Sequence, residues 1–477
     1  DAEAEDRPSV QVGDPYTEKL LIEATMEICA TGKVLACRDL GAAGFAGASS
    51  EMSSTFGAHI YADRVPLRET GMNEVEIMLA ESQERMLAEV APEDVALIGA
   101  IAEKYDLAWA DVGEVIAEPR YIIEFNGKTV CDLPIDLLVG GTPACRWETK
   151  AYSAEEPFRK PGDNLRTLCQ KVLSHPECAA KDWVFSQYDH DVQLRSVSLG
   201  PDAGVLRLDG DALYFTCGCN PRHIYLRPRD GTANAVLENA SNLACYGADP
   251  LCIVDCLNFA SPVHPEIAWQ IEESILGMGE MCRRLDVPIV GGNVSLYNES
   301  DEFDTRIKPT PMLGMIGKGD LRTFTPPEAG ATLVLVGTTS PDLGGSILDS
   351  VTGCGGPAPA VGDVETVLLV RDLVRDGALC AVTDLSRGGL VTALAKIAPC
   401  SSVSIEGDPI VALFSESYAR FLVAVDDPAV LKGTPHMVLG TVGGDALRIS
   451  AGDEEIVLTP ADLREASSTI TDLMRID

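Results

Sequence analysis

The sequence predicts a mixed α/β (α+β) protein that contains an internal duplication. Apolar residues make up 46% of its 477 residues and charged residues 23%, which is ordinary for a folded globular chain. Short apolar stretches typical of strands alternate with longer stretches typical of helices. Two segments near opposite ends of the chain share one pattern, and the length suits about two to four domains.

The repeated pattern is an apolar strand that ends in Asp-Leu, followed by a glycine-rich turn and a helix. It occurs near the start, with Asp39 at the strand end and a helix expected at residues 45–53. It returns near the end, with Asp384 in the same position and a helix expected at 390–397. A second match, Glu-Ser-x-x-Arg, follows the first in each copy and begins at Glu81 and at Glu416. Two matches in the same order indicate a gene duplication.

A different kind of unit separates the two copies. The elements expected there are strands within 203–215, 250–255 and 287–290 and helices at 233–246 and 266–285, with a further strand at 332–336 opening the last copy. A duplicated pair of unlike units would give the order A, B, A, B, whereas this chain gives B, A, B. We therefore expect one copy of unit A ahead of this sequence, which starts without Met.

Charge and cysteine content exclude several classes of function. The chain has 73 acidic and 37 basic residues, for a formal net charge of −36, and a field this negative repels nucleic acid. No apolar run reaches the ~18 residues of a membrane span, and no signal peptide is visible. Its 15 cysteines form no C-x-x-C pair and often lie in apolar runs, which predicts reduced, mostly buried thiols. We expect a cytoplasmic protein with no nucleic-acid or membrane partner.

Three aspartates, Asp39, Asp255 and Asp384, each end an apolar strand. A carboxylate at such a position can hold Mg²⁺, which prefers hard oxygen ligands. It can also cap a following helix, which Asp does routinely, and the residues alone favour this interpretation without excluding the other.

Two further motifs suit small polar ligands. Residues 291–295, Gly-Gly-Asn-Val-Ser, are expected to form a turn after a strand, where backbone N–H groups can approach an anion. Residues 81–83, Glu-Ser-Gln, place polar side chains between apolar neighbours, as recognition of a small molecule requires. A tight turn and a polar strand entry are the structural alternatives. The chain has no Walker loop, G-x-S-x-G elbow or H-E-x-x-H motif.

Taken together, these segments resemble one family, the PurL synthetase subunits of phosphoribosylformylglycinamidine synthase. The resemblance rests on residues 7–21, 39–44, 65–72, 81–86, 187–190, 220–222, 255–259 and 291–299. It implies the duplicated architecture of aminoimidazole ribonucleotide (AIR) synthetase, PurM-like, with three of four domains present. The expected division is 1–125 as a C-terminal-type domain, 126–165 as a connector, 166–322 as an N-terminal-type domain and 323–477 as a second C-terminal-type domain.

The resemblance implies a ligase of purine biosynthesis. Such an enzyme converts formylglycinamide ribonucleotide to formylglycinamidine ribonucleotide with ATP and Mg²⁺, through a phosphorylated amide. The ammonia would come from a PurQ-type glutaminase, assembled with a small PurS-type subunit. The alternative is a non-catalytic, nucleotide-binding scaffold subunit of the same complex. Another kinase-like enzyme of the superfamily is a third possibility, against which the substrate set below argues.

The resemblance also implies roles for individual residues. The expected substrate contacts are Gln11, Glu81, Ser82, Gln83 and Ser295, the expected ATP contacts are Asp255 and Gly292, and the expected Mg²⁺ ligands are Asp39 and Asn293. No catalytic residue is assigned, because the family's catalytic histidines and lysine belong to the absent first domain. Asp384 is expected to cap a helix. The sequence Cys217-Gly218-Cys219 stands where the family often has Thr-Asp-Cys, which weakens the case for a full metal site in the middle unit.

Overall fold

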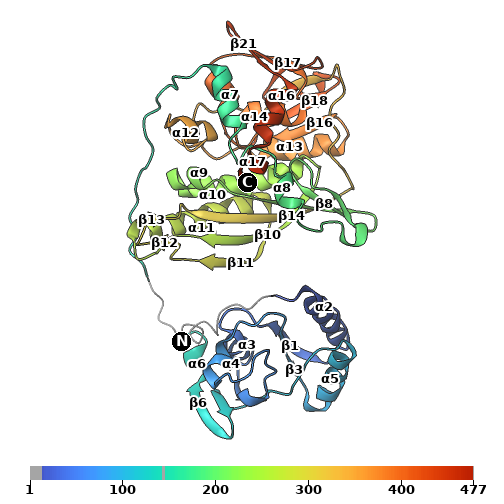
Figure 1. Cartoon of the computed structure of the whole chain (residues 1–477), viewed down its shortest axis with the longest axis vertical. Helices are drawn as coiled ribbons and strands as arrows, with labels where there is room; N and C mark the ends of the chain where they lie inside the picture. The colour runs from blue at the N-terminus through green and yellow to red at the C-terminus, as the bar shows by residue number, and fades with distance from the viewer. Residues whose placement is uncertain (1–12, 142–145, 476–477) are drawn as a thin grey trace. The chain divides into compact units, whose positions relative to one another are not determined.

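The computed structural model describes residues 13–141 and 146–475, and the chain divides into two compact units, Asp1–Arg146 and Trp147–Asp477 (Figure 1). We call them unit 1 and unit 2. None of the helices in the described ranges is long and apolar enough to cross a membrane.

Unit 1 contains two sheets. One pairs β1 (Val34–Asp39) with β3 (Met86–Val90), and the other has the order β4 (Gly113–Ile116), β2 (Gly57–Tyr61), β5 (Arg120–Phe125), β6 (Lys128–Pro134). Its helices are α2 (Pro15–Ala30), α3 (Gly44–Met52), α4 (Glu74–Leu79), α5 (Val95–Lys104) and α6 (Ile135–Leu138). Local sequence sets the helix starts, because Asp14 accepts hydrogen bonds from the first turn of α2 and Asn73 caps α4.

The first part of unit 2 is a six-stranded sheet with helices on one face. Its strand order is β11 (Ile289–Ser295), β10 (Asp249–Asn258), β14 (Thr310–Gly319), β9 (Ala212–Gly218), β8 (Gly204–Arg207), β7 (Ser196–Ser198). The accompanying helices are α7 (Leu165–Leu173), α8 (Asp182–Phe185), α9 (Pro221–Leu226), α10 (Pro228–Ala244) and α11 (Pro265–Leu285). All neighbours are antiparallel except β10 and β11, and a short hairpin of β12 (Glu299–Ser300) and β13 (Thr305–Arg306) follows β11.

The second part of unit 2 is a seven-stranded sheet. Its order is β16 (Ala381–Asp384), β18 (Phe421–Val425), β15 (Thr332–Val336), β19 (His436–Val442), β17 (Ser401–Ile405), β20 (Leu447–Ala451), β21 (Glu454–Leu458). Its helices are α12 (Ile347–Thr352), α13 (Val364–Arg375), α14 (Gly389–Ile397), α15 (Pro409–Phe414), α16 (Pro460–Ser467) and α17 (Thr469–Leu473).

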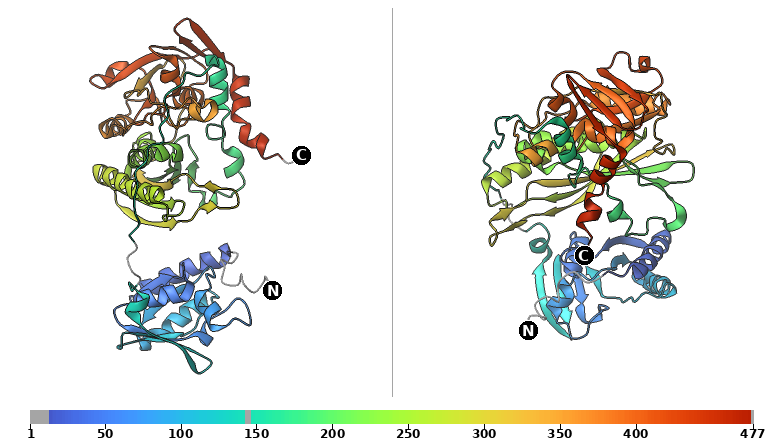
Figure 2. Two further views of the ribbon diagram at one scale, coloured as in Figure 1. Left: turned by 90° about the vertical axis from the view of Figure 1, so that its left-hand side faces the viewer. Right: turned by 45° about the horizontal axis from the view of Figure 1, so that its top comes forward.

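Helix α10 lies between the two sheets of unit 2 (Figure 2). Strand β15 shows how the layers share a core. Val334 and Val336 pack in the cluster that contains α10 and α13, whereas Leu333 and Leu335 pack on the other side with α14. Because successive strand residues point to opposite faces, an all-apolar strand predicts burial on both sides, and β15 is buried in this way.

The duplication is visible in the topology. β1 and β3 correspond to β16 and β18, which pair antiparallel in the same way. β2, β4, β5 and β6 correspond to β17, β19, β20 and β21, including one parallel pair in each copy. In unit 2, β15 pairs with both β18 and β19 and joins the two groups into one sheet. No described strand of unit 1 lies between β3 and β4, so its strands form two separate sheets.

The predicted helices and strands are present, but the structure differs from the sequence predictions in three respects. Residues 291–295 are not a turn after a strand, because they pair with β10 and lie inside β11. Residues 128–138, expected in the connector, form β6 and α6, and β6 pairs with β5 of unit 1. Only five of the fourteen cysteines among the described residues are buried. The expected division into domains stays a prediction.

Candidate functional site

The polar loop at residues 81–83 lies just before β3, beside the end of β1. The Glu81 Oε1 atom accepts a hydrogen bond of 3.2 Å from the Ala43 N–H at the start of α3, which has no other side-chain cap. The Gln83 side chain donates to the Glu81 carbonyl at 3.1 Å, and Ser82 is buried. The loop therefore closes over a helix N-terminus, where backbone N–H groups and the helix dipole favour anionic groups.

Arg85 holds this loop in shape. Its Nε donates to the Ser82 carbonyl at 2.9 Å, and its Nη2 donates to the Ala80 carbonyl at 2.6 Å. Gly44 permits the close approach of α3, because it has a φ of +53° and a Cβ atom there would lie 2.2 Å from the Ala80 carbonyl oxygen. The guanidinium thus binds the backbone carbonyls of Ala80 and Ser82, the two residues that flank Glu81.

Asp39 ends β1 as predicted and is exposed. The Leu40 N–H donates to the Arg85 carbonyl at 3.3 Å, which ties the end of β1 to the loop. No hydrogen bond to the Asp39 carboxylate is formed within residues 13–141, and Asp39 does not cap α3, whose N-cap is Ala43. The structure therefore brings Asp39 and the loop of Glu81 and Gln83 to one place. Gln11 lies outside the described residues.

The second predicted group lies on two parallel strands of unit 2. Asp255 of β10 pairs directly with Gly292 of β11. The Asp255 carboxylate extends over Gly292, so that a Cβ atom at 292 would lie 2.2 Å from Asp255 Oδ1. Burial raises the pKa of Asp255. A partly buried carboxylate of this kind gains stability from a hydrogen-bond donor brought by a ligand.

Asn293 and Ser295 continue along β11 on the opposite side from Asp255. They pair with Cys256 and Asn258, and residues alternate between the two faces of a strand. Asn293 is exposed, and the Ser295 hydroxyl contacts Asn298 Oδ1 at 3.3 Å. The Asn298 side chain also donates to the Ser295 carbonyl at 2.7 Å, which fixes the chain where it leaves the strand.

The second copy repeats the loop geometry of the first. Glu416 Oε1 accepts from the Gly388 N–H at 2.8 Å, as Glu81 does from Ala43. Arg420, which is fully buried, donates from Nε to the Ser417 carbonyl at 3.1 Å and from Nη2 to the Ser415 carbonyl. The Leu385 N–H donates to the Arg420 carbonyl at 2.8 Å. The motif Glu-Ser-x-x-Arg therefore encodes one loop structure twice.

Asp384 is not a helix cap, contrary to the prediction, because the N-cap of α14 is Gly388. It is buried in a polar cavity of about 280 Å³ with Asp202, Glu238 and Lys396. Lys396 Nζ lies 2.5 Å from Asp202 Oδ1, and the Asp202 side chain is only 1% exposed. Burial and the neighbouring Asp202 charge raise the pKa of Asp384 well above its usual value.

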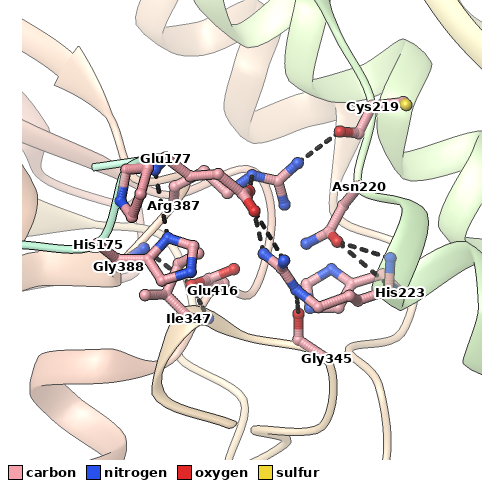
Figure 3. Close-up of polar contacts among 12 residues, drawn as sticks. His175, Glu177, Cys219, Asn220, His223, Gly345, Ile347, Arg387, Gly388 and Glu416 are labelled. Atoms are coloured by element: carbon pink, nitrogen blue, oxygen red, sulfur yellow. Dashed lines mark hydrogen bonds and ion pairs between the residues drawn. The ribbon is translucent and has the colours of Figure 1, made fainter. Parts of the chain in front are cut away.

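Charged side chains of the protein fill the space beside the second loop (Figure 3). Arg222 forms a bidentate pair with Glu177, with N–O distances of 2.7 and 3.0 Å, and Arg387 Nε lies 3.0 Å from the same carboxylate. Burial opposes ionisation of Glu177, but the hydrogen bond from Arg222 and the charge of Arg387 hold its pKa below the usual value. Burial raises the pKa of Glu416 to about 7.

His223 completes this cluster. It is fully buried, its Nδ1 lies 2.7 Å from the Tyr418 hydroxyl, and burial holds its pKa well below the usual value. Tyr418 occupies the position that Gln83 has in the first copy. The second loop is therefore built into a network of the protein's own side chains, whereas the first loop lies beside an exposed carboxylate. No group of three or more His, Cys, Asp or Glu side chains in the described part of the chain is arranged to hold a metal ion.

The sequence reasoning missed the role of Arg85 and Arg420 and the burial of Asp202. The two arginines had a visible signal, because both stand at the same place in the repeated motif. Asp202 had none, since its partners Thr383 and Lys396 lie far along the chain.

Comparison with known proteins agrees with this architecture. Residues 1–126 match the family "AIR synthase related protein, C-terminal domain", and residues 200–318 match "AIR synthase related protein, N-terminal domain". The chain is similar to the "Phosphoribosylformylglycinamidine synthase subunit PurL" of Methanosarcina acetivorans, with 46% identity over 99% of this chain and 70% of that protein. The PurL of Thermococcus gammatolerans is 43% identical over 98% of this chain and 69% of that protein.

Solved structures of PurL resemble the chain over most of its length. The PurLQS structure from Thermotoga maritima covers 91% of this chain and 68% of its own, with 26% identity and a TM-score of 0.69. The Thermotoga maritima PurL complexed with FGAR has 27% identity and a TM-score of 0.68, over 91% of this chain and 66% of that one. This chain belongs to the family of the PurL subunit of phosphoribosylformylglycinamidine synthase.

Proposed function

We propose that this chain takes part in the ATP-dependent conversion of formylglycinamide ribonucleotide (FGAR) to formylglycinamidine ribonucleotide. The observation that carries the proposal is the pairing of Asp255 with Gly292 on β10 and β11, which presents a partly buried carboxylate beside a position without a side chain. Thermotoga maritima PurL, to which the chain is similar, has been solved with ATP and with FGAR.

In the proposed reaction, ATP transfers its γ-phosphoryl group to the amide oxygen of FGAR, which turns a poor leaving group into a good one. Ammonia then adds to the amide carbon, and phosphate leaves with the former amide oxygen. Overall, FGAR, ATP, glutamine and water give formylglycinamidine ribonucleotide, ADP, phosphate and glutamate. Catalysis of phosphoryl transfer depends mainly on positioning and on electrostatic stabilisation.

The proposed contacts divide between ATP and FGAR. Asp255 and Gly292 would contact ATP. Gln11, Glu81, Ser82, Gln83 and Ser295 would contact FGAR, with Arg85 and the Ala43 N–H holding the loop of residues 81–83 in place.

Asp39 and Asn293 fit Mg²⁺ as ligands. Both offer exposed oxygen atoms, which this hard cation prefers, and the Asp39 carboxylate accepts no hydrogen bond within the described part of unit 1. When bound, Mg²⁺ neutralises charge on the phosphate groups. The partners that we propose are a PurQ-type glutaminase, as the source of ammonia, and a PurS-type small subunit, in a cytoplasmic complex.

A binding and turnover experiment tests the proposal. The purified chain is titrated calorimetrically with ATP and with FGAR, and product is measured with ammonium salts as the nitrogen source. The same assay is repeated with an added polypeptide that covers the part of Methanosarcina acetivorans PurL that this chain does not match. Turnover in the mixture, lost in Asp255→Asn, supports the synthetase. Nucleotide binding without turnover in any mixture supports the scaffold alternative, and absence of ATP binding contradicts both.

A further inference from the structure

The carboxylate of Glu84 joins three segments of unit 1. Glu84 directly follows the loop of residues 81–83, and its side chain is only 6% exposed. Its Oε1 atom accepts a hydrogen bond of 2.9 Å from the Asp14 N–H, and its Oε2 atom accepts one from Arg68 Nη2. The three sequence motifs that contain Asp14, Arg68 and Glu84 are separated along the chain, and they meet at this one side chain.

The bond to Glu84 fixes the start of α2. The Asp14 side chain caps this helix, because its Oδ1 atom accepts from the Tyr16 and Thr17 N–H groups at 3.1 and 3.2 Å. The helix start is therefore held twice, by the Asp14 side chain and by the Asp14 N–H. Gly13 lies against the same carboxylate, since a Cβ atom there would be 3.4 Å from Glu84 Oε1.

Residues that we propose as FGAR contacts lie on both sides of this link. The loop of residues 81–83 precedes Glu84, and Gln11 stands three residues ahead of Asp14 in the sequence. Three peptide units keep the Cα atom of Gln11 within about 12 Å of that of Asp14. Without the bond between Glu84 and Asp14, the start of α2 and the loop would be free to move independently.

The second copy shows that the loop does not need this carboxylate for its own shape. Glu84 has a φ of +54°, in the left-handed region that residues other than glycine seldom adopt. Ala419 stands at the same place in the repeated motif and has a φ of +55°. The backbone conformation is thus the same with a methyl group as with a carboxylate. The Glu84 carboxylate therefore serves contacts outside the loop, which Ala419 cannot make.

Arg68 makes the arrangement compatible with an anionic ligand. FGAR is a ribonucleotide and carries a phosphate group, so an uncompensated carboxylate beside the loop would repel it. The Arg68 guanidinium, whose side chain is 38% exposed, pairs with Glu84 and balances this charge within the protein. Glu84 can therefore hold the segments together without adding net negative charge beside the ligand.

We propose that Glu84 is a positioning residue for FGAR. It holds the start of α2 and the segment of Arg68 against the loop of residues 81–83, and so fixes the spacing of groups that bind one ligand. Affinity depends on such supporting contacts, because small displacements of binding groups weaken binding even where every ligand contact is retained. This inference rests on the proposed function, to which it adds a residue for FGAR recognition.

The variant Glu84→Ala tests the proposal, because Ala419 shows that alanine accepts this backbone conformation. We expect its FGAR affinity to fall by roughly tenfold or more in calorimetric titration of the full chain, with ATP affinity unchanged. Hydrogen exchange of the Asp14 amide, measured by mass spectrometry, should become about tenfold faster because the amide loses its acceptor. Glu84→Gln keeps an acceptor for this amide, so its FGAR affinity should lie between those of the native chain and Glu84→Ala.

Glu27→Ala is the matched control on the same helix. Glu27 ties the last turn of α2 to Lys104 and Tyr105, at 2.6 and 2.7 Å. The variant removes an ion pair from α2 but touches no proposed FGAR contact, so FGAR affinity should stay within about twofold of the native value.

The outcomes separate this inference from the proposed function. Equal FGAR affinity of the native chain and Glu84→Ala overturns the inference and leaves the proposed function standing. A fall in FGAR affinity that Glu27→Ala reproduces, or an equal fall in ATP affinity, also overturns it, because either would indicate general loosening of the fold. A native chain that does not bind FGAR contradicts the proposed role of unit 1 in FGAR binding, and the inference with it.

Discussion

The substitution Gly292→Ala tests the geometry of the proposed nucleotide site most directly. Asp255 and Gly292 face each other on parallel strands, and the aspartate side chain lies over the glycine. An added Cβ atom would lie 2.2 Å from Asp255 Oδ1, 2.5 Å from its Cγ and 2.8 Å from the Asp255 carbonyl oxygen. All three distances are shorter than van der Waals contact, so the carboxylate must rotate away and the strands must separate slightly.

The expected magnitude follows from the nature of these contacts. Rotation of a side chain relieves the two carboxylate contacts, but the carbonyl oxygen belongs to the strand ladder and cannot move freely. Overpacking of this kind costs about 1–3 kcal/mol in stability. If ATP binding uses the native position of the Asp255 carboxylate, the same displacement weakens binding by roughly 5- to 150-fold, at about 1.4 kcal/mol per tenfold change.

Gly291 provides the matched control, because a Cβ atom there meets nothing within 4 Å. Gly291→Ala is expected to change stability by less than about 0.5 kcal/mol and to leave ATP binding unchanged. Thermal unfolding and calorimetric titration with ATP measure both quantities on the full chain. Equal behaviour of the two alanine variants in both assays would refute the argument that the Asp255 carboxylate lies over Gly292.

Three further predictions concern the duplicated loops and the buried charges. Arg85→Met should weaken FGAR binding by roughly tenfold and leave ATP binding intact, because it removes two hydrogen bonds of about 0.5–1.5 kcal/mol each. Arg420→Met, the matched change in the second copy, should reduce only stability. Calorimetry that finds equal effects of the two variants on FGAR binding would contradict the assignment. Glu416 has a pKa of about 7 in the folded chain and a lower one unfolded, so the folded form binds its proton more tightly and the chain loses stability as pH rises toward 7. The free energy of unfolding of Glu416→Gln, measured in urea, should therefore rise relative to that of the native chain by about 2–3 kcal/mol as pH increases from 5 to 8. A difference between the two unfolding free energies that stays constant over this range would exclude the titration of Glu416. Lys396→Met should lower the free energy of unfolding by about 3 kcal/mol because it leaves the Asp202 carboxylate buried without its cation. Adding Asp202→Asn should restore most of this stability. Additive losses in the double variant would show that the two residues are not coupled.

The local elements were readable from the sequence because their signals are local. The strand ending at Asp39 and the helix after it follow from an apolar run and a glycine turn, and both are present. The same signals located β15 at residues 332–336 without error. The duplication was readable too, since two ordered matches survive in the sequence, and it extends to the hydrogen bonds of Glu81 and Glu416.

Pairing between strands overrode the local signal at Gly292. Glycines usually mark turns, and the sequence therefore predicted that the strand ends before Gly291. In the structure, parallel pairing with β10 carries the strand through to Ser295. The glycine is required there by the neighbouring Asp255 side chain, which is a contact between residues 37 positions apart and leaves no trace in the local pattern.

The different environments of the Asp39 and Asp384 side chains could not be predicted from the sequence. Both end a strand before a glycine-rich turn, so local reasoning treats them alike. Asp39 is exposed, whereas Asp384 is buried beside Asp202 and Lys396. The groups that surround Asp384 come from other elements of the fold, and only the tertiary structure brings them together.

Comparison of the two copies distinguishes the residues that hold the loop in shape from those that differ between the copies. Glu81 and Arg85 have counterparts with the same hydrogen bonds in the second copy, so these bonds maintain the loop whether or not a ligand binds. Where the copies differ, the space beside the second loop is occupied by side chains of the protein. Tyr418, in the place of Gln83, contacts His223, and Arg387 pairs with Glu177 beside it. A loop of the same shape thus lies beside an exposed carboxylate in one copy and is bonded into the protein's own polar network in the other. On the site assignment proposed above, substrate binding by the first copy depends on the positions at which the copies differ, Gln83 and the surroundings of Asp39, and the shared residues act through the backbone they hold.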